Sequence, residues 1–228
     1  MAAGKPLRRM SLLRLLPGDL LKNERTGLKT RHYNTGGPRS ATILLMHPAN
    51  HTDALVAAIN PYTSADVQAI LRERSWLASV EPTAEQTAWC EHAAAMLGGH
   101  AADRGTLAEL LGLVFHYDAR EIIARVDSHV VLSRYAARDV IRQVALLLLD
   151  GGPLTSERFK GIVTALKDGM NLRGRELFHP IRLALAGRAG EGELDRVILL
   201  LDEAAALSFG APVKSARGRI LEFCSVLD

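Results

Sequence analysis

The chain has 228 residues, of which 48% are hydrophobic and 23% are charged, as is typical of a soluble globular protein. This composition excludes a collagen-like, low-complexity or wholly disordered chain, and no apolar run reaches the roughly 18–20 residues that a membrane helix needs. Two cysteines are too few for a disulfide scaffold or a thiolate metal site, so both are expected to be buried thiols.

The first 40 residues form a strongly basic leading segment. They hold nine Lys or Arg residues against two acidic ones, whereas the rest of the chain carries a net charge of −4. Such a segment is typical of an arm that contacts polyanions, and a solvated terminus is the alternative. The first 18 residues lack acidic side chains, as organelle presequences do. We therefore expect a cytoplasmic protein, or one of a mitochondrial or other organellar matrix, and not a secreted one.

Residues 42–46 are a short apolar run that fits either a strand or a buried helical turn. No second run of strand character accompanies it, so we expect an all-α protein without a sizeable sheet. Three parts are predicted: a basic, irregular arm over 1–52, an all-helical domain over 53–207 with a candidate subdomain break at 151–153, and a C-terminal tail over 208–228.

Helix starts within the helical domain are indicated by polar residues that can bond free backbone amides. They are Thr63 or Ser64, Thr83 with Gln86, Thr106 with Glu109, and Asp118 with Glu121. A longer helix is expected over 128–150, ended by two glycines and a proline.

Three further helices are predicted after residue 153. The first carries an apolar stripe from Phe159 to Leu166 and is expected to end at Gly169. The second has Pro180 in its first turn and reaches Gly187. The third carries the apolar run from Leu194 to Leu201.

Patterns of catalytic and metal-binding residues are missing from the sequence. It contains no nucleophile elbow, phosphate-binding loop or dinucleotide fingerprint, and its eight histidines form no H-E-x-x-H pattern. We therefore predict no catalytic residue, no metal site, no cofactor and no enzyme activity.

A second basic cluster lies between residues 155 and 190, with seven Lys or Arg residues against three acidic ones. Guanidinium groups in loops and at helix ends can reach phosphates or stack on unpaired bases. A solvated helical surface is the alternative interpretation. The candidate RNA-binding residues of this cluster are Lys167, Arg173, Arg175 and Arg188.

The segment LRGRELFHPIRLALAG over 172–187 resembles a stretch near the end of bacterial and organellar glutamyl-tRNA synthetases. That stretch has the form G-[KR]-x-L-[FY]-x-P-[LI]-R-x-A-L-T-G, and a glycine-rich loop and an apolar helix follow it, as they do here over 190–201. The resemblance covers about 155–205, extends back to about residue 75 and does not include 1–60. It implies the all-helical cage of two subdomains that binds the tRNA anticodon in that family.

The resemblance also implies two site residues. The family's arginine in the P-L-R stretch contacts anticodon bases, and Arg182 matches it. An apolar residue at the start of the next helix helps to hold a base, and Leu194 matches it. The chain departs from the family at Ala186, where threonine is usual, and at Glu191 and Glu193, whose carboxylates would repel phosphate.

Two functions follow as hypotheses. The first is a non-catalytic module that binds tRNA or another structured RNA, because the H-I-G-H-like and K-M-S-K-S-like motifs of the synthetases are missing. The second is a structural subunit of a larger ribosomal or organellar complex, which reuses a synthetase-derived helical domain and contacts other subunits through residues 1–40. A small-molecule enzyme on a helical body has no supporting set of residues.

Overall fold

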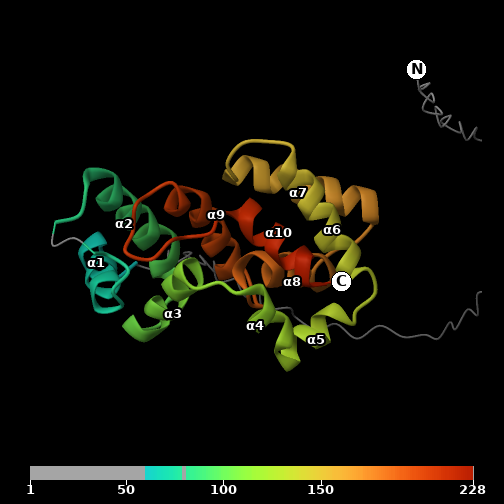
Figure 1. Cartoon of the computed structure of the whole chain (residues 1–228), viewed down its shortest axis with the longest axis horizontal. Coiled ribbons are helices and arrows are strands. Elements are labelled where there is room, and N and C mark those ends of the chain that lie inside the picture. The colour runs from blue at the N-terminus through green and yellow to red at the C-terminus, as the bar shows by residue number, and fades with distance from the viewer. Residues whose placement is uncertain (1–59, 79–80, 228) are drawn as a thin grey trace, which may run out of the picture. The chain divides into compact units, whose positions relative to one another are not determined.

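The computed structural model describes residues 60–78 and 81–227, which all belong to one compact unit, Asp53–Asp228. Over these residues the chain forms α-helices, one 3-10 turn and no strand, so the all-α prediction is confirmed (Figure 1). The predicted arm over 1–52 and the apolar run at 42–46 lie outside the described residues. The helices are α1 (Ser64–Glu73), α2 (Ala84–Leu97), α3 (Arg104–Phe115), α4 (Ala119–Ala124), α5 (Val126–Leu132), α6 (Ala137–Leu149), α7 (Ser156–Met170), α8 (Arg175–Ala186), α9 (Glu193–Ala205) and α10 (Ala216–Leu227).

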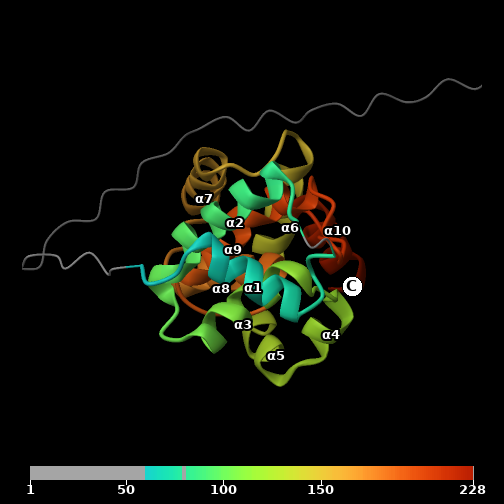
Figure 2. The same ribbon diagram turned by 90° about the vertical axis from the view of Figure 1, so that its left-hand side faces the viewer.

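Three C-terminal helices join the two ends of this unit. Helix α9 packs against α2 and α3, while α8 and α10 pack against α6 and against each other. Figure 1 shows α1 to α3 at one end, α6 and α7 at the other, and α8 to α10 between them. In the view of Figure 2, α1 lies in front of α8 and α9. The core is therefore assembled mostly from contacts between distant parts of the sequence.

Several predicted helix starts are confirmed. Thr63 and Thr83 cap α1 and α2, and each forms a complete capping box with the residue three positions later. The Asp118 side chain accepts hydrogen bonds from the amides of Arg120 and Glu121 and caps α4. These caps are local, so the sequence is sufficient to find them.

Two other predictions are wrong. Helix α3 begins before Thr106, because the Asp103 carboxylate accepts a 2.7 Å hydrogen bond from the Thr106 amide. The single helix expected over 128–150 is two helices, α5 and α6, separated at Ala136, whose left-handed backbone (φ 60°) cannot continue a right-handed helix. Both helices keep an apolar face, so the spacing of apolar residues in the sequence does not reveal the break between them.

The later helices also differ from expectation at their ends. Helix α7 ends at Asn171, which adopts φ 53°, and not at Gly169. Helix α8 begins after Gly174 (φ 55°), a backbone that glycine adopts at little cost, so Pro180 lies beyond the first turn. Gly187 caps α8 as predicted, with φ 79°.

The segment predicted as a tail over 208–228 contains α10, whose buried residues include Ile220 and Phe223. The helical body therefore continues past residue 207. The subdomain break at 151–153 stays a prediction.

Candidate nucleic-acid interface

Arg182 lies in the middle of α8, and its side chain is almost fully buried, with 7% of the residue exposed. Its Nε and Nη2 donate to the two carboxylate oxygens of Asp195, each at 2.8 Å, and Nη1 donates to the backbone oxygen of Gly190. The Phe178 ring lies 4.9 Å from the guanidinium carbon. The guanidinium thus has a bidentate carboxylate, a carbonyl and an aromatic face as partners within the protein.

These contacts hold the loop between α8 and α9 against α8. Arg175, the first residue of α8, pairs with Glu191 of this loop at 3.4 Å. The Glu193 carboxylate accepts a hydrogen bond from the Glu191 amide. Both carboxylates that depart from the family pattern therefore bond to groups of the protein itself.

Leu194, the second residue implied by the resemblance, is fully buried in the first turn of α9. A side chain on Gly190 would clash with it, since a Cβ there would lie 2.8 Å from Leu194 Cδ1. The structure brings Arg182 and Leu194 close to the same loop, but both are covered by protein. An RNA base could reach either of them only after the Arg182–Asp195 pair opens and the loop moves.

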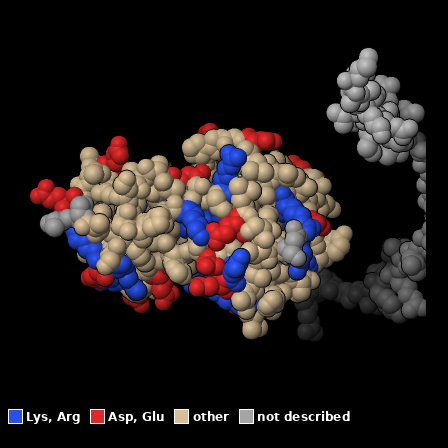
Figure 3. Space-filling model, viewed as in Figure 1, with Lys and Arg blue, Asp and Glu red and all other residues tan. Residues whose placement is uncertain are grey.

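The four predicted basic residues are exposed. Lys167 is in the last turn of α7, Arg173 and Arg175 flank the start of α8, and Arg188 follows its end. On the face seen in Figure 3, Lys and Arg side chains are interspersed with Asp and Glu.

His179 connects α8 to the turn after α5. Arg134 Nη1 lies 3.1 Å from His179 Nδ1, and because arginine has no acceptor, Nδ1 accepts this bond and the proton sits on Nε2. Nε2 is buried and has no hydrogen-bond partner among the described residues. Burial, followed by the charges of Arg134, Arg175 and Arg182, lowers the pKa of His179, and Glu191 opposes them.

Arg219 of α10 is the residue that sequence analysis missed most clearly. It is fully buried, and its guanidinium donates to the backbone oxygens of Leu113 (2.8 Å), Val114 (2.5 Å), Leu185 (2.9 Å) and Lys214 (3.2 Å). Three of these oxygens belong to the last turns of α3 and α8, where carbonyls have no partner within the helix. Two partly negative helix ends therefore surround one buried cation.

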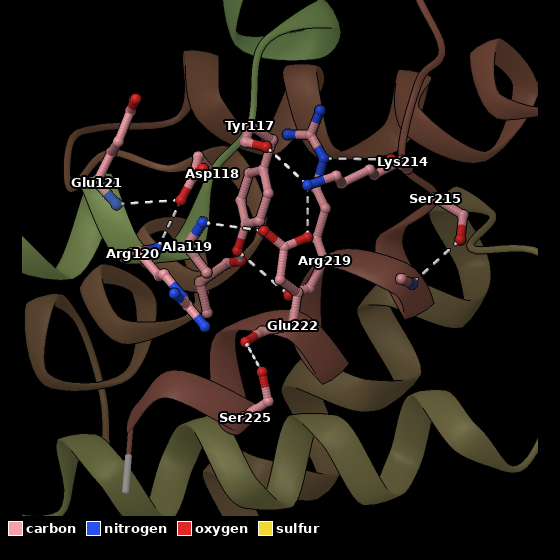
Figure 4. A network of polar contacts seen from close by, with 12 residues as sticks. Tyr117, Asp118, Ala119, Arg120, Glu121, Lys214, Ser215, Arg219, Glu222 and Ser225 are labelled. Atoms are coloured by element: carbon pink, nitrogen blue, oxygen red, sulfur yellow. Dashed lines mark hydrogen bonds and ion pairs between the residues drawn. The ribbon is translucent and has the colours of Figure 1, made fainter.

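Tyr117 completes this centre, which Figure 4 shows from close by. Its ring lies 4.6 Å from the Arg219 guanidinium carbon, and its hydroxyl donates to the carbonyl of Ala184 in the last turn of α8. Burial lowers the pKa of Arg219 to about 10 and raises that of Tyr117 above its usual value. Arg219 and Tyr117 together fix the ends of α3 and α8 relative to each other.

A more exposed ion pair borders the same centre. Lys214 Nζ lies 2.6 Å from Glu222 Oε2 and donates to the Tyr117 carbonyl at 3.0 Å, while Glu222 Oε1 accepts a bond from the Ala119 amide (Figure 4). The start of α4 is thereby tied to α10. A helix in the predicted tail was detectable in principle, since Ile220, Phe223 and Leu227 follow helical spacing.

Three other kinds of site have little support in the described part of the chain: a reactive thiol, a metal site and a membrane-spanning helix. Burial raises the pKa of the Cys90 thiol to about 11, so it is not a thiolate nucleophile at neutral pH. Within residues 60–78 and 81–227 no group of three or more metal-ligating side chains occurs. No helix in these ranges has the length and apolar character needed to cross a membrane.

Comparisons with known proteins give partial matches to one kind of enzyme. No protein-family model and no solved structure matches the chain. It is 32% identical over 77 residues to glutamate–tRNA ligase 2 of Syntrophus aciditrophicus, which covers 34% of this chain and 16% of that ligase. It is 27% identical over 123 residues to the glutamate–tRNA ligase of Exiguobacterium sibiricum, covering 54% of this chain and 25% of that ligase. The matches thus span a quarter or less of these ligases, and the chain contains a region similar to part of a glutamate–tRNA ligase.

Proposed function

We propose that the helical body is a non-catalytic RNA-binding module, related to the anticodon-binding part of glutamyl-tRNA synthetases. The observation that carries the proposal is the similarity to glutamate–tRNA ligases, which extends over 123 residues in one comparison. The all-α fold and the folded segment 172–187 agree with it. The proposal excludes catalysis because neither synthetase signature motif occurs among the 228 residues.

The exposed cations along α8 are the proposed phosphate contacts. Arg173 and Arg188 are exposed at opposite ends of this helix, and neither forms an ion pair within the described residues. Arg175 is exposed as well, although it pairs with Glu191. Base contact by Arg182 or Leu194 remains a prediction of the resemblance, and it requires the Arg182–Asp195 pair to open.

Filter binding of the full chain to tRNA at several salt concentrations tests the proposal. Binding at low salt should weaken as salt rises, because each phosphate contact releases counterions. The double variant Arg173→Ala/Arg188→Ala should reduce the steepness of the log–log salt dependence by about 1.5, at roughly 0.7–0.9 per contact. Arg217→Ala, an exposed arginine of α10, is the matched control and should leave the slope unchanged. Absence of tRNA binding by the unaltered chain at low salt would overturn the proposal.

A structural role in a larger complex is the second candidate, and an exposed apolar surface on α5 favours it. Val126 and Val130 are 79% and 54% exposed, and Tyr135 just beyond this helix is 91% exposed. Apolar side chains gathered on a surface are typical of protein contacts. Size-exclusion chromatography of a native extract tests this role, and elution at the mass of one free chain would contradict it.

A further inference from the structure

A cleft of about 480 Å³ opens beside the centre formed by Arg219 and Tyr117. This volume lies within the roughly 300–1,000 Å³ that small-molecule sites occupy. Its walls come from five separate segments: the turn after α1, helix α3, helix α4, the end of α8 and the segment between α9 and α10. Representative lining residues are Trp76, Gly112, Phe115, Ile122 and Gly187.

Aromatic and apolar side chains make up the inside of the cleft. Trp76, which is half-buried, stacks on Phe115 with ring centroids 4.8 Å apart and an interplanar angle of 7°. Ile122 and Ala186 also line the cleft. An accessible aromatic ring is a surface on which an unstacked nucleobase can stack.

Charged side chains stand at the edge of the same cleft. Arg74 and Arg125 are exposed and come from different segments, and Arg125 Nη1 donates to the Gly187 carbonyl at 3.2 Å. Glu109, also exposed, offers a carboxylate acceptor. The Asp118 carboxylate is already bonded to the first amides of α4.

The walls of the cleft are fixed before any ligand binds. Arg219 joins the ends of α3 and α8 through their carbonyls, and those ends line the cleft. Gly187 allows α8 to approach α4, because a Cβ at this position would lie 3.0 Å from Ile122 Cδ1. A preformed site loses little conformational entropy on binding.

We propose that this cleft binds one unstacked nucleotide of single-stranded RNA, with its base against Trp76 and its flanking phosphates on Arg74 and Arg125. The inference rests on the proposed RNA-binding function and assigns a site separate from Arg182 and Leu194. Glu109 can accept a hydrogen bond from an amino or imino N–H group on the edge of the base. Every nucleobase carries such a group, so this contact does not select one base.

Steric filling of the cleft is the first test, measured by fluorescence anisotropy of the full chain with 12-nucleotide single-stranded RNAs. Gly112→Leu extends a side chain towards Trp76 and should weaken binding about ten-fold or more, the range of one lost base stack. Gly112→Ala is the matched control and should bind within about two-fold of the unaltered chain, since its Cβ would lie 3.6 Å from Trp76 Cη2, an ordinary contact. Thermal unfolding of both variants verifies that they remain folded.

Tryptophan fluorescence supplies a second, direct readout. RNA should quench the emission of the unaltered chain, and Trp76→Phe should abolish the quenching, because Trp89 is 3% exposed and lies in the core. Quenching retained in Trp76→Phe would overturn the assignment of this cleft.

The two proposals fail in distinguishable ways. If the unaltered chain binds RNA and Gly112→Leu binds it equally well, the cleft is not the site but the proposed function stands. If the unaltered chain binds neither tRNA nor the single-stranded RNAs at low salt, the proposed function fails and the cleft proposal fails with it.

Discussion

Two arginines are buried among the residues that the structure describes, and the protein holds them in opposite ways. Arg182 in α8 is paired with a carboxylate, Asp195, in a bidentate ion pair. Arg219 in α10 has no carboxylate on its guanidinium and donates only to backbone carbonyls. The first arrangement links one helix to the loop that follows it, whereas the second joins helix ends more than 70 residues apart in the sequence.

The two arginines therefore differ in how far water can reach the groups that they bind. The Arg182–Asp195 pair reaches water on one side, since the Asp195 side chain is 23% exposed, whereas the Arg182 side chain is 8% exposed. The Arg219 guanidinium, by contrast, is completely buried against α3 and α8, so water does not reach it. We infer that Arg219 fixes the scaffold and that Arg182 fixes the loop beside it.

Replacement of Arg219 should have the largest effect. Arg219→Met leaves the terminal carbonyls of α3 and α8 without donors in a site that excludes water, at about 1–3 kcal/mol for each uncompensated group. We expect the free energy of unfolding to fall by about 3–5 kcal/mol, measured by urea denaturation. Arg217→Met, on the exposed side of the same helix, is the control and should change it by less than about 0.5 kcal/mol. Similar losses of stability in the two variants would show that the Arg219 guanidinium does not hold the ends of α3 and α8 together.

Removal of the carboxylate at the other arginine should have a smaller effect. Asp195→Ala takes away two charge-assisted hydrogen bonds, which are worth about 1.5–3 kcal/mol, while the partial exposure of the pair limits the penalty. The double variant Arg182→Met/Asp195→Ala should recover part of this loss, because it leaves no unpaired charge. Urea denaturation of Arg182→Met, Asp195→Ala and the double variant provides the double-mutant cycle. A double variant that loses the sum of the single losses would contradict the pairing.

The sequence predicts those parts of the fold that depend on neighbouring residues. The capping box of Thr83 with Gln86 involves side chains three positions apart and was predicted from the sequence, as was a cap at Thr63 or Ser64. The helix ends at Ala136 and Asn171 were not, because a left-handed backbone at a residue other than glycine is imposed by packing around it.

The candidate site shows the same limit. The resemblance led to Arg182, but its partners depend on how the loop after α8 folds back, and neither Asp195 nor the Gly190 carbonyl was expected there. Arg219 was missed because its partners Leu113 and Leu185 are set by the tertiary fold alone. Segments far apart in sequence likewise create the cleft at Trp76, which no local pattern indicates.

The smallest predicted effect distinguishes the two regions by pH. His179, beside Arg182, has a pKa lowered by burial and by Arg134, Arg175 and Arg182, so the folded protein binds fewer protons there than the unfolded chain. Its contribution to stability is therefore complete above the ordinary histidine value of about 6.5 and is lost as the pH falls towards the lowered pKa. His179→Asn keeps an acceptor for Arg134 but does not titrate. We expect this variant to lose less thermal stability than the unaltered chain between about pH 7.5 and about pH 5.

The exposed His129→Asn is the control, and it should follow the unaltered chain. Because Arg219 stays protonated throughout this range, with a pKa of about 10, the region around it should add nothing to the pH dependence. Equal losses in His179→Asn and the unaltered chain would assign the acid sensitivity to other groups.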